Sequence, residues 1–388
     1  MKKFKKANIW LEQLASEAKF FSDKKTPSLK PIKEMLEKLG NPDHSFEWRV
    51  IVGGTAGKGT VCRLTEDVLL REGKTVGTLM SPHLQVITER IRINGKLIST
   101  ENFGESILNI KEVSKENEIS LTYYEAIILA GIYAVKEAGC EILIAEVGLG
   151  GEFDGVNAIE GERISALTFI GKDHMDILGD LKSIAKTKAG IFTQETVLAL
   201  SGEKVFKDEI SKKSKVEVEF VKGISQKLNK KISRKICKKI LKKSDFEFRN
   251  LSIPARWEKI QNIILDGAHS EPRFEYIFPK IKKIPGKKIG ILGMLKNHDI
   301  NAFKVIINEF DEIFWVDDFS EDRACHLGKE LFKCFKKGRT DYSKTLDALK
   351  YVEDNFADAK IFVLGSFYLC GKVRNKFYLP NKILSLEG

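Results

Sequence analysis

A glycine-rich turn at residues 53–60, Gly53-Gly-Thr-Ala-Gly-Lys-Gly-Thr60, limits what this chain can fold into more than any other feature. It follows residues 49–52, an apolar run that predicts a buried strand, and precedes residues 61–71, where apolar side chains recur at helical spacing. Consecutive backbone N–H groups in such a turn can surround an anion, and the helix N-terminus adds partial positive charge. An ordinary strand-to-helix turn would explain the glycines. It would not explain Lys58, which can reach β and γ phosphates, or Thr60, whose hydroxyl can bind Mg²⁺.

Strand and helix patterns alternate through the rest of the chain. Strands are predicted at residues 75–80, 141–146 and 166–170, with helical patterns between them, notably 124–137. After Pro254 a second series has strands at 263–265, 288–292, 312–316 and 360–364, and helices near 321–336 and 343–354. This order is typical of an α/β fold with parallel strands and helices on both faces of each sheet. We predict two domains, 1–252 and 253–388, the second smaller and Rossmann-like, which suits a length of 388 residues.

The composition fits a globular protein, with 43% hydrophobic and 31% charged residues. The longest apolar stretch, residues 126–135, is too short to span a bilayer, and residues 7–18 are amphipathic rather than a signal-peptide core. The six cysteines are scattered without a C-x-x-C pair, which favours free thiols in a reducing compartment. We therefore expect an unprocessed cytoplasmic protein that makes no membrane contact.

Positive charge is concentrated in one segment. The chain has 65 Lys and Arg against 54 Asp and Glu, a net charge of +11, and residues 222–243 hold ten basic and no acidic residues. Apolar side chains recur at helical spacing within this segment, at Leu228, Ile232, Ile236, Ile240 and Leu241. The pattern predicts a surface helix with a solvated basic face, or one that contacts a polyanion. No aromatic residue lies among the lysines, so nucleic acid is not expected as a partner.

Further motifs occur in a fixed order along the chain. They are Leu79-Met-Ser-Pro-His-Leu84, Thr88-Glu-Arg-Ile-Arg-Ile-Asn-Gly95, Ala145-Glu-Val-Gly-Leu-Gly-Gly151 with Asp154 and Asn157, Gly171-Lys-Asp-His174 and Lys188-Ala-Gly-Ile191. In the second half they are Pro254-Ala-Arg-Trp-Glu258, Leu265-Asp-Gly-Ala-His269, Gly293-Met-Leu-Lys296 and Gly365-Ser-Phe-Tyr-Leu369. Together with the turn at 53–60, these motifs resemble the Mur ligase superfamily. The inserted Gly59 resembles its folylpolyglutamate synthase/dihydrofolate synthase branch.

The resemblance implies an ATP-dependent ligase that adds L-glutamate to the carboxylate of dihydropteroate or a folate through an acyl phosphate. It implies an ATP-binding central domain, a C-terminal glutamate ligase domain, and Mg²⁺, with two ions expected. We expect a monomer whose partners are these small molecules. Two alternatives stay open: a Mur-type amide ligase for another carboxylate and amino acid, and a catalytically decayed protein that still binds ATP.

The resemblance also implies roles for single residues. ATP contacts are expected from Gly54, Thr55, Gly57, Lys58, Gly59, Thr60, Arg256 and Asp266. Metal ligands are expected at Thr60, Ser81, Glu146 and His174, and substrate contacts at His83, Arg90, Asp154 and His269. Lys58, His174, Lys188 and His269 are the expected catalytic residues, with Lys188 carrying a carbamate formed from CO₂.

Plainer interpretations of four of these residues stay open. Glu146 could cap a backbone turn, Ser81 could be a turn residue, and His83 could order its loop. Lys188 could be a surface lysine.

The sequence departs from the family pattern at several positions. Ala56 stands where the loop usually has Asn, Glu152 where Arg is expected, and Ser270 where Asn is expected. Glu152 matters most, because an anion beside anionic substrates is unfavourable unless a nearby lysine compensates it. This exchange leaves the identity of the acid substrate open.

Overall fold

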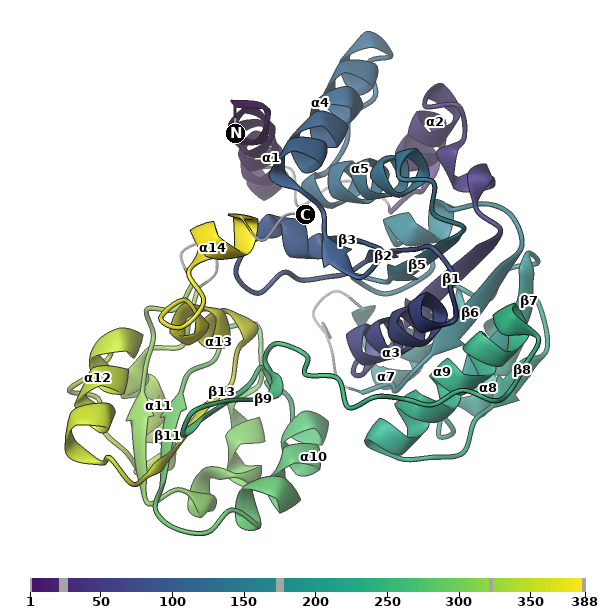
Figure 1. Ribbon diagram of the computed structural model, residues 1–388. Helices are drawn as coiled ribbons and strands as arrows, with labels where there is room; N and C mark the ends of the chain where they lie inside the picture. The colour runs from purple at the N-terminus through teal and green to yellow at the C-terminus, as the bar shows by residue number, and fades with distance from the viewer. Residues whose placement is uncertain (1, 21–26, 172–177, 321–323, 386–388) are drawn as a thin grey trace. The chain divides into compact units, whose positions relative to one another are not determined.

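The computed structural model describes residues 2–20, 27–171, 178–320 and 324–385 (Figure 1). The chain divides into two compact units, one made of residues 2–83 and 87–250 and the other of residues 84–86 and 251–385. Each unit has its own sheet and its own apolar clusters. The domain ranges expected from the sequence, 1–252 and 253–388, stay a prediction.

The first unit is organised around an eight-stranded sheet in the part of the chain that the structure describes, with strand order β4-β3-β2-β5-β1-β6-β7-β8. The strands are β1 (Trp48–Gly53), β2 (Val76–Leu79), β3 (Ile91–Ile93), β4 (Lys96–Leu97), β5 (Ile142–Glu146), β6 (Arg163–Leu167), β7 (Thr196–Ser201) and β8 (Val218–Phe220). From β2 to β8 every neighbouring pair is parallel, whereas β3 and β4 form an antiparallel edge. The central strands are buried except at the half-buried Trp48, as expected for parallel strands covered on both faces.

Helices cover both faces of this sheet. Side chains alternate along each strand, so Val50 and Val52 join one apolar cluster while Ile51 joins the other. The first cluster is covered by α3 (Lys58–Arg71) and α9 (Ser225–Leu241), which lie side by side in Figure 1. The second cluster includes residues of α1 (Lys2–Phe20), α2 (Lys30–Lys38), α4 (Thr100–Glu116), α5 (Tyr123–Glu137), α7 (Leu181–Ala189) and α8 (Lys207–Lys213). Short 3₁₀ turns are η1 (Pro42–Ser45), η2 (Ile87–Arg90) and η3 (Gly155–Ala158).

The second unit has a five-stranded sheet within the described residues, in the order β12-β11-β13-β10-β9. The strands are β9 (Arg256–Ile260), β10 (Ile263–Asp266), β11 (Lys288–Leu292), β12 (Glu312–Trp315) and β13 (Lys360–Leu364), all parallel except β9. The other elements are α10 (Glu271–Lys282), η4 (Ile300–Val305), η5 (Ile307–Glu309), α11 (Gly328–Phe335), α12 (Thr345–Asn355), α13 (Phe367–Arg374) and α14 (Pro380–Ser385).

Residues 84–86 belong to this second unit although they are distant from it in sequence. Leu84 packs against its apolar cluster, and Gln85 Nε2 donates to Asn375 Oδ1 (2.7 Å) and to the Tyr378 carbonyl (2.8 Å). The chain therefore passes from the first unit to the second, returns, and passes over again after residue 250.

The predicted α/β class is confirmed, and most predicted strands occur within one or two residues of their expected bounds. The helix expected near 321–336 is shorter, because α11 begins at Gly328. One strand prediction was wrong in its bounds. Residues 166–170 were expected, whereas β6 spans Arg163–Leu167. The fully buried Arg163 explains the error, because a charged residue does not read as the start of a buried strand. Its guanidinium is accommodated by hydrogen bonds to the Ile159 carbonyl (3.0 Å), Asn157 Oδ1 (2.9 Å) and Thr193 Oγ1 (2.7 Å).

The basic segment forms α9, as its spacing predicted. Leu228, Ile232, Ile236 and Ile240 are buried against the sheet side, while Leu241 is half-buried and most of the lysines are exposed. No helix in the described ranges combines the length and apolar character needed to cross a membrane. All six cysteines are free, and only Cys334 is exposed.

Candidate active site

Four neighbouring parallel strands of the first unit end at the same edge of the sheet and carry the predicted residues there. The glycine-rich turn follows β1, Ser81 follows β2, Glu146 ends β5, and residues 168–171 follow β6. The strand register pairs Val52 with Glu146 and Gly53 with Leu167. The carboxyl edge of a parallel sheet, where neighbouring connections leave in different directions, is the usual ligand site of open α/β folds.

The turn at 53–60 has the backbone of a phosphate-binding loop. Gly54 and Gly57 have φ of 129° and 93°, values that favour glycine, and α3 begins at Lys58 directly after them. The first amides of α3 are thus presented at the turn, beside the positive end of the helix dipole. Lys58 Nζ donates to the Gly54 carbonyl (2.9 Å) and so lies over the loop. The Thr55 side chain is fixed by the segment that follows β6, because its Oγ1 accepts a hydrogen bond from Gly171 N (3.1 Å).

Oxygen ligands suited to Mg²⁺ lie next to this loop. The Glu146 side chain is 5% exposed, and its Oε2 accepts a hydrogen bond from Ser81 N (3.2 Å). A Cβ atom placed on Gly59 would lie 3.4 Å from Glu146 Oε2, so the carboxylate reaches the first turn of α3, where Thr60 also lies. Among the described residues no group of three or more His, Cys, Asp or Glu side chains is arranged to hold a metal ion. One carboxylate and hydroxyl groups fit Mg²⁺, which keeps several waters and uses few protein ligands.

Tyr124 lies beside Glu146. Its hydroxyl donates to the Glu146 carbonyl (3.5 Å). Burial raises the pKa of Tyr124 well above its ordinary value, so the phenol stays neutral. The sequence did not single out Tyr124.

His83 and Arg90 contact each other. Arg90 Nε donates to His83 Nδ1 (2.9 Å), and the Arg90 guanidinium lies 5.8 Å from the centre of the Tyr123 ring. Burial, with the Arg90 charge as the second cause, lowers the pKa of His83 to about 3. The imidazole is therefore neutral at pH 7 and orders the turn that follows β2. Its predicted contact with substrate stays a prediction.

Acid should weaken folding through His83. The unfolded chain takes up a proton at His83 near pH 6.5, whereas the folded protein does so only near pH 3. The His83 contribution is present above pH 6.5 and is lost as the pH falls from 6.5 to 3. We expect His83→Gln, which keeps a hydrogen-bond acceptor for Arg90 without titrating, to show a shallower loss of unfolding free energy over that range. Urea titrations at several pH values measure both slopes, and equal slopes would contradict the assignment.

Asp154 holds the loop that follows β5. Its Oδ2 accepts from Gly148 N (2.9 Å) and Leu149 N (2.8 Å), and its Oδ1 accepts from Val156 N (3.1 Å). Burial raises the pKa of Asp154 to about 6, although these three N–H groups oppose the shift. The contacts support a role in shaping the loop. The predicted contact with substrate is not tested by them.

Glu152 has the compensating lysine that its position requires. Lys213 Nζ lies 2.6 Å from Glu152 Oε1, with both side chains about one-third exposed. The backbone of Glu152 is also fixed, because its N–H donates to the Thr187 carbonyl (2.9 Å) and its carbonyl accepts from Asn157 Nδ2 (2.9 Å). The exchange of the family's Arg for Glu is thus matched by a cation on α8.

Replacing Glu152 by the arginine of the family pattern, without a change at Lys213, should destabilise the fold. We expect Glu152→Arg to lower the free energy of unfolding by about 0.5–1 kcal/mol, because two cations then face each other in a partly exposed site. Adding Lys213→Glu should recover most of that loss. Urea unfolding of both single variants and the double variant measures the coupling. A double variant no more stable than Glu152→Arg would show that the pair contributes nothing.

Lys188 lies in the last turn of α7 and is 2% exposed, so it is not the surface lysine that the sequence left open. A Cβ atom placed on Gly151 would lie 3.0 Å from Lys188 Cα, which places the loop after β5 directly against this turn. His174, the other expected residue of this region, lies outside the described residues.

The predicted residues of the second unit lie at the carboxyl edge of its sheet. Asp266 ends β10, is fully buried, and accepts from Arg273 Nη2 (3.0 Å). His269 stacks on His298 with ring centres 4.4 Å apart, and Arg256 lies over the Phe367 ring at 4.2 Å. Their roles toward ATP and glutamate stay predictions. Arg273 and His298 were not predicted, because neither occurs in a motif.

One further residue lies at the phosphate loop. The Asn229 side chain, from the buried side of α9, lies against Gly57: a Cβ atom placed there would be 2.8 Å from Asn229 Oδ1. Asn229 was not predicted, because the lysines around it dominate the pattern of α9.

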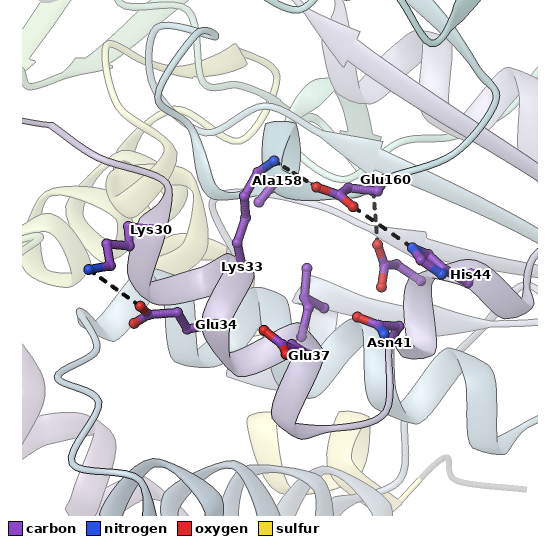
Figure 2. A pocket seen from close by; sticks show the side chains of 10 residues that line it. Lys30, Lys33, Glu34, Glu37, Asn41, His44, Ala158 and Glu160 are labelled. Atoms are coloured by element: carbon purple, nitrogen blue, oxygen red, sulfur yellow. Dashed lines mark hydrogen bonds and ion pairs between the residues drawn. The ribbon is translucent and has the colours of Figure 1, made fainter.

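The hollow drawn in Figure 2 is a different place. It has a volume of about 530 Å³, lies between α2, η1 and residues 158–160, and contains none of the predicted site residues. Lys33 Nζ and Glu160 Oε1 lie 2.7 Å apart across it, and Glu160 N donates to Asp43 Oδ2 (2.8 Å). Because none of its lining residues belongs to the turn at 53–60 or to the strand ends beside it, this hollow is separate from the site described above.

Comparison with known proteins gives consistent matches. The Mur ligase middle domain family matches residues 52–264. A dihydrofolate synthase/folylpolyglutamate synthase of Buchnera aphidicola subsp. Acyrthosiphon pisum (strain APS) is 32% identical over 333 residues, covering 76% of this chain and 79% of that protein.

Solved structures share the fold. Escherichia coli FolC in complex with DHPP and ADP superposes with a TM-score of 0.82 at 24% identity, covering 96% of this chain and 97% of that one. A bifunctional folylpolyglutamate synthase/dihydrofolate synthase with Mn, AMPPNP and L-glutamate bound has a TM-score of 0.79 at 25% identity, covering 94% and 98%. The predicted two-part α/β architecture is confirmed.

Proposed function

The chain belongs to the dihydrofolate synthase/folylpolyglutamate synthase family of Mur ligases, and from that membership we propose that it joins L-glutamate to a pterin-linked carboxylate using ATP. One observation in this chain carries the proposal. The phosphate loop and the Glu146 carboxylate lie on adjacent strands, with Val52 and Glu146 in register, at one edge of the sheet. This arrangement suits a reaction in which anionic groups must be brought together.

The reaction has two steps. A carboxylate oxygen of the acid attacks the γ-phosphorus of ATP, ADP leaves, and an acyl phosphate forms. The amino nitrogen of L-glutamate then attacks the acyl carbon and loses a proton, and phosphate leaves as the amide forms. Both steps need stabilisation of negative charge on phosphate oxygens, which the amides at the start of α3 and the Lys58 ammonium can supply.

Glu146, Thr60 and Ser81 would hold Mg²⁺, since they supply the oxygen donors that this ion prefers. When bound, the ion neutralises phosphate charge. Ser81 N donates to Glu146 Oε2 (3.2 Å) and so fixes the carboxylate. This contact orients the Glu146 donor before any ligand arrives, so less reorganisation is required on binding.

We further propose that Lys188 carries a carbamate, formed when Nζ attacks CO₂ and releases a proton. The support is the family motif at residues 188–191 and the burial of Lys188 against the loop that follows β5, which sets it apart from the exposed lysines of the chain. Mass spectrometry and ¹³C NMR after exchange with ¹³C-bicarbonate should show one adduct in the wild type and none in Lys188→Gln. The exposed Lys186 on the same helix offers the matched control, Lys186→Gln, which should keep the adduct.

Phosphate release with ATP, Mg²⁺ and L-glutamate against a panel of pterin carboxylates tests the function. Release that requires both glutamate and a pterin acid supports the proposal and identifies the acid. Release that requires a different acid would replace it with a Mur-type ligase of other specificity. Nucleotide binding without turnover for any acid would indicate a decayed enzyme.

A further inference from the structure

The segment 168–171, which follows β6, lies next to the phosphate loop and forms several hydrogen bonds with it. Thr168 N donates to the Gly53 carbonyl (3.0 Å), and Thr55 N donates to the Phe169 carbonyl (2.6 Å). Gly171 N donates to Thr55 Oγ1 (3.1 Å). We call residues 168–171 the supporting segment.

Thr168 contributes a side chain to this contact as well as its backbone. It is fully buried, and its hydroxyl lies 2.7 Å from the Ala56 carbonyl and 3.2 Å from the Gly53 carbonyl, with the shorter contact to Ala56. Ala56 has no polar side chain where the family pattern has Asn. Position 56 of this chain is therefore anchored through its backbone.

Peptide geometry converts these contacts into a direction for the loop amides. In a trans peptide the C=O of one residue and the N–H of the next point to opposite sides. With the carbonyls of Gly53 and Ala56 bonded to Thr168, the N–H groups of Gly54 and Gly57 point away from the supporting segment. The peptide between Gly54 and Thr55 has the opposite orientation. Its N–H, from Thr55, faces Phe169 in the supporting segment, and its carbonyl, from Gly54, accepts from Lys58 Nζ (2.9 Å) on the other side. The side toward which Gly54 and Gly57 N–H point is therefore the side that carries Lys58.

The supporting segment is itself fixed by residues 202 and 203, which follow β7. Glu203 is 4% exposed, and its Oε2 accepts from Ile170 N (3.2 Å). Its Oε1 accepts from Lys204 N and Val205 N (2.7 Å each). Gly202 N donates to the Leu167 carbonyl (2.8 Å). The residues after β7 therefore hold the start of the supporting segment in place.

We propose that Thr168 is a positioning residue for nucleotide binding: its hydroxyl holds the Ala56–Gly57 peptide so that the Gly57 N–H faces the phosphates. This inference rests on the proposed function for its ligand, a nucleoside polyphosphate, but not on the acid or the amine. It predicts a specific loss of nucleotide affinity when the hydroxyl is removed, because the loop must then be ordered by the ligand.

The test is the dissociation constant of ADP, measured by calorimetry without acid or glutamate. Thr168→Val keeps the shape and removes the hydroxyl, and we expect ADP to bind about 10-fold more weakly, the scale of one lost hydrogen bond. Thr168→Ser keeps the hydroxyl and should bind within about 2-fold of wild type. The matched control is Thr78→Val on β2, since Thr78 is also fully buried and its hydroxyl has no hydrogen-bond partner within the described residues. Its ADP affinity should not change.

Two outcomes would overturn the inference: Thr168→Val binding ADP as tightly as wild type, or Thr168→Ser weakened as much as Thr168→Val. If Thr168→Val does not fold, Thr168→Ala takes its place against the same serine variant. An affinity loss confined to Thr168→Val, in a protein that shows no glutamate-dependent phosphate release, supports this inference while contradicting the proposed function.

Discussion

Replacing Lys58 by alanine is expected to lower the rate of phosphate release by about 10²–10³-fold, the scale seen when one charge-stabilising donor is lost. Lys58 begins α3 and its Nζ bonds to the Gly54 carbonyl, so the ammonium is already over the loop. Its charge is required most when negative charge moves onto the leaving ADP. The loss should therefore appear in kcat more than in KM for the acid.

Lys115→Ala is the matched control, because Lys115 is an exposed lysine in the last turn of α4. It should leave the rate unchanged. Near-normal turnover in Lys58→Ala would contradict the assignment of residues 53–60 as the phosphate loop. Thermal unfolding of both variants separates a loss of charge from a loss of folded protein.

Glu146→Gln should reduce turnover by at least about 10²-fold and shift the remaining activity to higher Mg²⁺ concentration. Glutamine is nearly the same size and can still accept from Ser81 N, so the change removes charge with little change in shape. A titration of rate against Mg²⁺ at saturating ATP measures the shift.

The same strand offers a control at its other end. Glu141, directly before β5, accepts from Thr75 N (2.9 Å) and Lys74 Nζ (2.6 Å). Glu141→Gln should cost some stability and leave the Mg²⁺ titration unchanged. If Glu146→Gln also left that titration unchanged, Glu146 would not be a metal ligand, and its role would be to hold Ser81.

The fold could be predicted to the extent that it depends on local pattern. Buried runs such as residues 288–292 and 360–364 became strands with those bounds, because apolar runs of that length between turns are typical of covered parallel strands. The antiparallel edge strands β3 and β9 were not predicted. Edge strands carry mixed polarity, and their pairing depends on partners distant in sequence.

The position of a candidate residue could be predicted where a motif directly follows a strand. Contacts between side chains of different elements could not be predicted. Loop residues 53–60 and Glu146 follow directly from their strands. The pairing of Glu152 with Lys213, and the contacts of Asn229 and Thr168 with the loop, join segments separated by many residues. Local periodicity contains no information on such pairs, because the tertiary fold alone decides which side chains meet.

The placement of residues 84–86 has a practical consequence. Since this short stretch is bonded to Asn375 and Tyr378, and Leu84 packs into the apolar cluster there, a truncated chain ending near residue 250 would leave these side chains without their binding surface. A protease cut at residue 250 alone would likewise yield two fragments still held together through this stretch. Gel filtration after such a cut should therefore show co-elution of the two fragments.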